Sequence, residues 1–165
     1  LRSDTKGAKE IIGTIRLKEK FGHIKPKNLD VAIIGAGIAG LCSALLLERL
    51  GCNVIVFEKE KYIKTEGAGI QITSNGLFVL KKLDLDRPVV EAGLKPNKLC
   101  LIDEVNFKSI GCLEIRHRLK RRYGRSFITL HRSLLVKILF EKVREKKIRV
   151  NFGSRALPLL SLIHI

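Results

Sequence analysis

Methionine and tryptophan are absent from this chain of 165 residues, and other aromatic residues are scarce, with two tyrosines and seven phenylalanines. The lack of methionine, even at position 1, leads us to expect a fragment or a processed chain. So few aromatic rings leave little material for a surface on which nucleic-acid bases stack. With 45% hydrophobic residues the composition excludes a largely disordered protein, and the length suits one compact domain.

Sequence patterns of metal sites and disulfide frameworks are also missing. The four cysteines, Cys42, Cys52, Cys100 and Cys112, include no C-x-x-C pair and lie in apolar or mixed sequence surroundings. Such cysteines argue against a zinc site and against a disulfide framework. We therefore expect reduced cysteines, no metal and a cytoplasmic location.

A long apolar run is missing as well. The longest uncharged stretch, residues 31–47, has seventeen residues, which is the lower limit for a transmembrane helix. It contains Gly35, Gly37 and Gly40, so a buried strand that turns into a buried helix explains it better. The first residues also lack the apolar core of a secretory signal. We therefore expect no transmembrane span.

Acidic residues are outnumbered, with 16 Asp and Glu against 32 Lys and Arg, which gives a net charge of +16. Residues 108–165 carry fifteen basic and three acidic residues, whereas residues 29–107 carry nine and ten. This excess would suit nucleic acid or an anionic membrane surface, although solvated basic helix faces explain it more simply. A basic binding protein without enzymatic activity stays open as an alternative, and we expect no specific nucleic-acid partner.

The chain divides into three parts. Residues 1–28 mix charges with short apolar pieces and indicate a basic leader or linker. Residues 29–152 carry regular patterns and form the predicted domain. Residues 153–165 are apolar without a continuing pattern, which indicates a truncated or non-native tail.

The domain begins with a strand, a glycine turn, a helix and a second strand. Residues 31–34 are an apolar run typical of a strand buried on both faces. Residues 38–50 predict a helix that ends at Gly51, and residues 53–57 predict the second strand. In such units the strands are parallel and the crossover is right-handed. The pattern therefore predicts an α/β fold with a Rossmann-like parallel sheet.

A shorter helix follows over residues 77–83. Ser74 or Asn75 is its expected cap, and residues 84–88, which include a proline, are expected to break it. Beyond it the pattern predicts two strands and then a basic exposed stretch, at residues 99–102, 110–115 and 116–125.

The second long helix is predicted over residues 132–146. Leu135, Leu139 and Val143 recur every four residues and place one apolar stripe on this helix. Residues 148–152 then predict a third strand of the parallel sheet.

The glycine turn is a complete G-x-G-x-x-G motif, Gly35-Ala36-Gly37-Ile38-Ala39-Gly40, between a strand and a helix. Gly35 permits the tight turn, and Gly37 lets backbone N–H groups approach a pyrophosphate. Gly40 lets the helix lie close to the strand, and the helix N-terminus adds a partial positive charge under the phosphates. The motif predicts a dinucleotide site.

Glu58 is the acidic partner of this turn. It lies eighteen positions after Gly40, at the end of the second strand, where a carboxylate accepts hydrogen bonds from a ribose. The turn and Glu58 do not decide which dinucleotide binds, so an NAD-binding Rossmann dehydrogenase or binding module stays open. The following segment, residues 67–71, suits that alternative poorly, because a further strand and helix would be expected there.

Two segments resemble the FAD-dependent aromatic hydroxylases, the flavoprotein monooxygenases of the salicylate hydroxylase and p-hydroxybenzoate hydroxylase type. The first combines the glycine turn and Glu58 with Glu66-Gly67-Ala68-Gly69-Ile70-Gln71-Ile72-Thr73-Ser74-Asn75-Gly76. The second is Arg122-Tyr123-Gly124 followed by Leu130-His131-Arg132-Ser133-Leu134. The resemblance covers about residues 29–150 and stops before the family's second FAD motif and its substrate sheet. It implies that residues 29–152 are the N-terminal portion of an FAD-binding domain.

The resemblance also implies which residues contact FAD. The turn and the acidic residue would hold the ADP part, Ala68 and Gly69 would lie beside the flavin, and Arg132 would be a positive contact. Lys64 stands where the family usually has arginine, and it keeps the charge without the bidentate geometry. The full implied set is Gly35, Ala36, Gly37, Gly40, Glu58, Lys59, Lys64, Ala68, Gly69 and Arg132.

The implied activity is that of the whole family. NAD(P)H reduces the flavin, and one oxygen atom of O₂ passes to a small aromatic or similar substrate. The protein supplies positioning and excludes water. The sequence identifies no catalytic acid or base, and His131 is interpreted as structural. The fragment by itself is expected to be weak or inactive in turnover.

Overall fold

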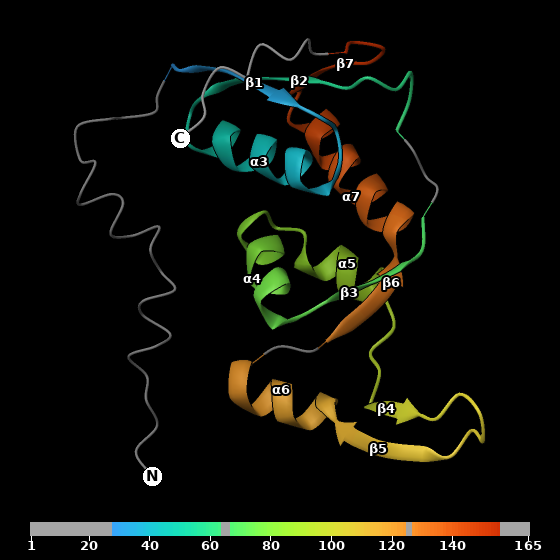
Figure 1. Ribbon diagram of the computed structural model, residues 1–165. Helices are drawn as coiled ribbons and strands as arrows, with labels where there is room; N and C mark the ends of the chain where they lie inside the picture. Colours follow the sequence, from blue (N-terminus) through green and yellow to red (C-terminus); the bar gives the residue numbers. More distant parts are fainter. Residues whose placement is uncertain (1–27, 64–66, 125–126, 156–165) are drawn as a thin grey trace, which may run out of the picture.

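The computed structural model describes residues 28–63, 67–124 and 127–155. Its upper part is a three-stranded parallel sheet made of β1 (Asp30–Ile34), β2 (Asn53–Phe57) and β7 (Arg149–Asn151) (Figure 1). The strand order is β1-β2-β7, so β2 lies in the centre. The predicted parallel sheet and its third strand are confirmed. The predicted tail beyond residue 155 and nearly all of the predicted leader lie outside the described residues.

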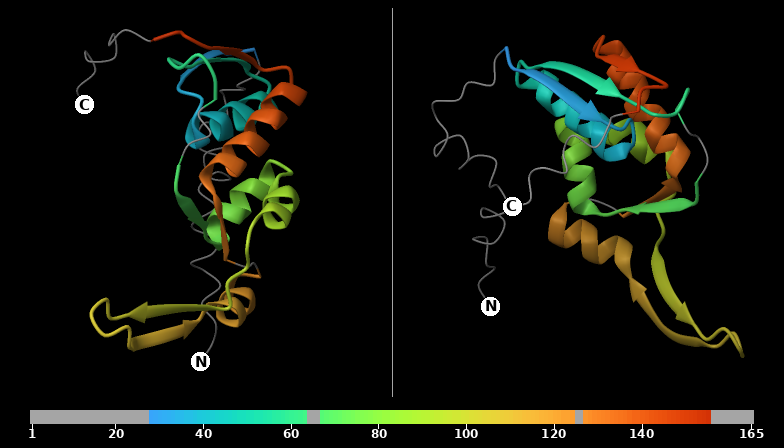
Figure 2. Two further views of the ribbon diagram at one scale, coloured as in Figure 1. Left: turned by 90° about the vertical axis from the view of Figure 1, so that its right-hand side faces the viewer. Right: turned by 45° about the horizontal axis from the view of Figure 1, so that its top comes forward.

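Two long helices pack on one face of this sheet and on each other (Figures 1 and 2). They are α3 (Ile38–Arg49) and α7 (Arg132–Glu145). The predicted stripe of α7 is confirmed, because Leu135, Leu139 and Val143 are all buried. Beyond α3, Gly51 has a φ of +88°, which suits the left-handed end of a helix.

The expectation that β1 is buried on both faces is wrong. Val31 and Ile33 are partly buried, whereas Ala32 and Ile34 are exposed, and 54% of Ile34 is accessible. Helices cover only one face of the sheet among the described residues. Four apolar residues in a row predict a strand, but they do not show how many faces are covered.

The middle of the molecule is an antiparallel pair of strands with two short helices. The strands are β3 (Gly69–Ile72) and β6 (Ile128–His131), and the helices are α4 (Ser74–Lys82) and α5 (Asp86–Ala92). The predicted helix at 77–83 is present but starts earlier, after Thr73. The predicted break is present, because α4 ends at Lys82, but a second helix, α5, begins at Asp86. Pro88 occupies the first turn of α5, where a missing N–H costs nothing.

The lower part is a hairpin followed by a helix (Figure 1). β4 (Lys98–Ile102) and β5 (Ser109–Glu114) pair in antiparallel fashion, as predicted, and all their residues are exposed. The stretch predicted only as basic and exposed is the helix α6 (Ile115–Tyr123). Figure 2 shows the hairpin projecting from the rest of the molecule.

The expectation of four reduced cysteines is wrong for one pair. Cys100 and Cys112 are joined by a disulfide, whereas Cys42 and Cys52 form no disulfide. The hairpin explains the error, because its register places Cys100 directly opposite Cys112 with their Cα atoms 4.1 Å apart. Sequence spacing alone does not reveal such cross-strand neighbours.

Within the described ranges, every helix is too short or too polar to cross a lipid bilayer.

Candidate functional site

The glycine turn joins β1 to α3 in the predicted conformation. Gly35 has a φ of +99°, a left-handed conformation that side chains rarely adopt. A Cβ on Gly40 would overlap the carbonyl oxygen of Gly35. The two glycines therefore bring the first turn of α3 against the end of β1, as the motif requires.

Gly37 has a different reason for lacking a side chain. It precedes α3 with an ordinary φ of −80°, and a Cβ built on it would meet no protein atom within 4 Å. Neither backbone strain nor protein packing therefore requires glycine at this position. A pyrophosphate bound at the helix N-terminus would require it, because a Cβ would occupy the space that the phosphates need.

The carboxylate of Glu58 is held by backbone donors. Its Oε2 accepts the N–H of Ala36 at 2.7 Å, and its Oε1 accepts the N–H of Glu60 at 3.0 Å. Partial burial alone would raise the pKa of Glu58. Backbone hydrogen bonds and the charge of Lys59 outweigh burial, so this pKa lies below its ordinary value. Each carboxylate oxygen keeps a lone pair that can accept a hydrogen bond from a ribose hydroxyl.

A cavity of about 170 Å³ lies beside this carboxylate. Five of the predicted FAD contacts line it, namely Ala36, Gly37, Glu58, Lys59 and Arg132. A larger hollow of about 690 Å³ lies elsewhere, at residues such as Asp30, Glu48 and Lys146, and includes none of the glycine turn. Of these two cavities, the smaller is the candidate site, because it combines the motif with charged side chains of both signs.

Sequence reasoning missed four residues of the cavity, which are Glu60, Tyr62, Ile63 and Val136. The first three follow Glu58 closely along the chain, so their position after the second strand was the available signal. Val136 lies one helical turn after Arg132 on α7. Lys64 lies outside the described residues.

The pairing of β3 with β6 brings the two resembling segments together. Gly69 is paired with His131, and the N–H of Arg132 donates to the carbonyl of Ala68 at 3.2 Å. Gly67 lies against Arg132, because a Cβ there would be 3.3 Å from the Cδ of that side chain. Arg132 thus contacts the Gly-Ala-Gly segment and also lines the cavity beside Glu58. Ala68 and Gly69 do not line this cavity themselves.

His131 takes no part in the cavity. Its exposed ring lies with Nδ1 2.6 Å from the hydroxyl oxygen of Ser133. This contact is local to the start of α7.

The fold and the site are those of a Rossmann-like α/β protein, with a glycine turn, a carboxylate hydrogen-bonded to that turn and a nearby arginine. Comparison with known families is more specific. Residues 30–148 match the family described as FAD dependent oxidoreductase, and the chain belongs to this family. FAD is therefore its cofactor, and NAD as the bound dinucleotide is not favoured.

Among curated relatives, the chain is 33% identical over 104 residues to 3-hydroxybenzoate 6-hydroxylase 1 of Aquipseudomonas alcaligenes. That match covers 63% of this chain and 26% of the relative. The chain is 28% identical over 135 residues to 3-hydroxybenzoate 6-hydroxylase of Polaromonas naphthalenivorans. That match covers 81% of this chain and 34% of the relative. The chain thus spans only about a quarter to a third of these relatives.

Solved structures give the same result. The tetrameric form of 2-methyl-3-hydroxypyridine-5-carboxylic acid oxygenase aligns with a TM-score of 0.69 at 26% identity, covering 79% of this chain and 33% of that one. Klebsiella pneumoniae HpxO, in complex with FAD and uric acid, aligns with a TM-score of 0.66 at 26% identity. This alignment covers 77% of this chain and 31% of the HpxO chain. Both support a portion of an FAD-binding monooxygenase fold.

Proposed function

We propose that this chain is the FAD-binding portion of a monooxygenase that uses NAD(P)H and O₂ to hydroxylate a small aromatic or similar molecule. The observation that carries the proposal is the cavity in which the glycine turn, Glu58 and Arg132 meet. The names of the relatives support the reaction class, since they include hydroxylases of 3-hydroxybenzoate and urate and a 3-monooxygenase of 6-hydroxynicotinate. The substrate class rests on those names.

Different residues of the site would hold different parts of FAD. Glu58 would accept hydrogen bonds from the adenosine ribose, while Gly37 and the N-terminus of α3 would face the pyrophosphate. Lys59 and Arg132 would offset the phosphate charge. The Gly-Ala-Gly segment, held to Arg132 through Ala68, would lie beside the flavin, together with Gly69.

Bound FAD would supply the redox chemistry, accepting hydride from NAD(P)H and activating O₂. The described residues offer orientation and charge, and none of them is assigned as an acid or base. Turnover by this chain alone is therefore expected to be weak or absent.

Two further assignments belong to this proposal. Residues 29–152 would form the partial FAD-binding domain, between a leader or linker and a tail. We propose a cytoplasmic location, which suits the reduced thiols of Cys42 and Cys52, although the exposed Cys100–Cys112 disulfide is unusual there. It is tested by fractionation of cells that express the tagged chain.

FAD binding by the purified chain tests the proposal directly. Titration followed by flavin fluorescence should give saturable binding, which Gly37→Val should abolish by filling the phosphate space. Gly111→Val is the matched control, because a Cβ at Gly111 also meets no atom within 4 Å but lies in the hairpin. Binding of NAD in place of FAD, or equal loss in both variants, would overturn the assignment.

The basic-binder alternative has its own readout. Binding to DNA or anionic vesicles that collapses with modest salt and ignores FAD would support it. We expect instead that FAD affinity is insensitive to competing nucleic acid.

A further inference from the structure

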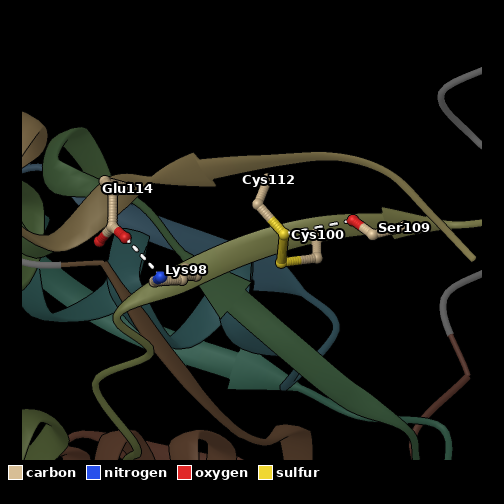
Figure 3. Close-up of a disulfide and its surroundings, with 5 residues drawn as sticks. All are labelled: Lys98, Cys100, Ser109, Cys112 and Glu114. Atoms are coloured by element: carbon tan, nitrogen blue, oxygen red, sulfur yellow. Dashed lines mark hydrogen bonds and ion pairs between the residues drawn. A yellow bond between two sulfur atoms is a disulfide. The ribbon is translucent and has the colours of Figure 1, made fainter.

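The hairpin of β4 and β5 carries a reactive group that the flavin site does not use. Cys100 and Cys112 are bonded across the two strands, and both residues are exposed (Figure 3). A thiolate in solution therefore reaches the sulfur atoms without any opening of the fold. We propose that this bond is a reversible exchange site for an anionic small thiol of the glutathione class, with attack at Cys100.

The direction of attack follows from a neighbouring hydroxyl. The Oγ of Ser109 lies 3.5 Å from the Sγ of Cys112 (Figure 3). This hydroxyl can donate a hydrogen bond to the sulfur as it becomes a thiolate, which makes Cys112 the better leaving group. Among the described residues no such donor lies at Cys100. The incoming thiolate therefore bonds to Cys100 and expels Cys112.

The exchange balances in two steps. A thiolate of the small thiol attacks the Sγ of Cys100, the Sγ–Sγ bond breaks, and its electron pair stays on Cys112, which takes a proton from solvent. A second thiolate attacks the mixed disulfide at the sulfur of the small thiol and releases Cys100. Two small thiols are oxidised to their disulfide, and the protein disulfide gains two electrons.

The hairpin has other bonds that keep the two cysteines opposite each other after reduction. The Nζ of Lys98 lies 2.8 Å from Glu114 at the open end of the hairpin. At the turn, Oδ1 of Asp103 accepts the N–H groups of Val105 and Asn106 at 2.8 and 3.1 Å. Because these bonds hold both ends of the hairpin, the two thiols stay opposite each other after reduction. The disulfide can therefore form again on oxidation.

Charge favours an anionic thiol. Residues 98–124, the hairpin and α6, contain seven Lys and Arg against three acidic residues, namely Asp103 and Glu104 at the turn and Glu114, which is paired with Lys98. Five of the seven basic residues lie on α6, which has no acidic residue, follows β5 directly and packs beside β4. An anionic thiol is therefore attracted to the hairpin, and salt screens that attraction.

Thiol exchange on the full chain, without FAD, tests the proposal independently of the flavin assignment. The chain is purified without reductant, treated with millimolar glutathione at neutral pH, quenched with acid and mapped by mass spectrometry. We expect a glutathione adduct on Cys100 that precedes two free thiols, and recovery of the disulfide with oxidised glutathione. Buried Cys52 should stay unmodified throughout, which shows that the chain remains folded.

Two comparisons sharpen this test. Ser109→Ala should slow the first step by about three- to tenfold, the range expected for one lost hydrogen bond, whereas Ser43→Ala on the exposed side of α3 should not. Added salt should slow glutathione but not neutral 2-mercaptoethanol. The proposal is overturned by a disulfide that resists glutathione while Cys52 stays protected, by adducts mainly on Cys112, or by equal salt effects.

Discussion

The carboxylate of Glu58 accepts the backbone N–H of Ala36 at 2.7 Å, which fastens the end of β2 to the turn before α3. The other carboxylate oxygen bonds the N–H of Glu60, so the side chain is fixed from two directions. A ligand that needs this carboxylate finds it already oriented and does not have to restrict its rotation.

The first prediction concerns pH. The pKa of Glu58 is below its ordinary value of 4.5, because hydrogen bonds and Lys59 outweigh its partial burial. A carboxylate with a lowered folded-state pKa stabilises the fold above its unfolded-state pKa, and this contribution disappears as pH falls through the folded-state value. We expect the urea midpoint of the chain to fall on acidification below about pH 5.

Its control is a pair of variants. Glu58→Gln should show a shallower dependence over this pH range, whereas Glu141→Gln on the exposed side of α7 should follow the parent chain. Identical acid profiles for the parent and Glu58→Gln would show that the carboxylate contributes nothing to this dependence.

The second prediction concerns Gly40. Gly40→Ala places a methyl group onto the carbonyl of Gly35, and backbone has to move to make room. We expect a loss of stability of about 1–3 kcal/mol, typical of overpacking, measured by chemical unfolding. Gly111→Ala, which meets open space, is the control. Equal stabilities of the two variants would mean that α3 tolerates displacement from β1.

The sequence predicted the parallel unit well, because its signals are local. The apolar run of β1, the turn from Gly35 to Gly40 and the stripe of α7 each lie in one short window. The strands β3 and β6 are different, since four residues such as Gly69–Ile72 carry no clear alternation and are strands only because they pair. The disulfide was not predicted for the same reason, because only the pairing of β4 with β5 places Cys100 opposite Cys112.

The site was predictable to a similar degree. Glu58 and the glycine turn follow from their spacing, and the cavity brings them together as expected. The position of Arg132 required the resemblance, because a basic residue at a helix start is ordinarily solvated. Tyr62 follows Glu58 closely along the chain, whereas Val136 could not be found, since only the fold brings α7 to the cavity beside Glu58.

The third prediction concerns the stripe on α7. Leu139 is fully buried, so Leu139→Ala should cost about 2–5 kcal/mol through lost burial and a remaining cavity. Leu134 on the same helix is 42% exposed, and Leu134→Ala should change stability by less than about 1 kcal/mol. Thermal or urea unfolding of both variants measures the difference. A small effect at Leu139 would contradict its place in the core.

The fourth prediction concerns Arg132 and FAD. Arg132→Gln keeps a long polar side chain but removes the charge beside the cavity, so FAD affinity should fall by about tenfold, as for loss of one charge-assisted hydrogen bond. Arg144→Gln, at the exposed last turn of the same helix, should bind FAD like the parent chain. Parallel titrations by flavin fluorescence decide this, and equal affinities would remove Arg132 from the site.

The central position of β2 sets an order of events during synthesis. Its partner β1 precedes it closely, but its other partner β7 begins only at Arg149, and the N–H of Glu58 donates to the carbonyl of Asn151 at 2.8 Å. The ribosome therefore releases the glycine turn long before the strand that completes its surroundings. A nascent chain can form the glycine turn early, but the backbone at Glu58 gains its bond to β7 only after nearly a hundred further residues have emerged.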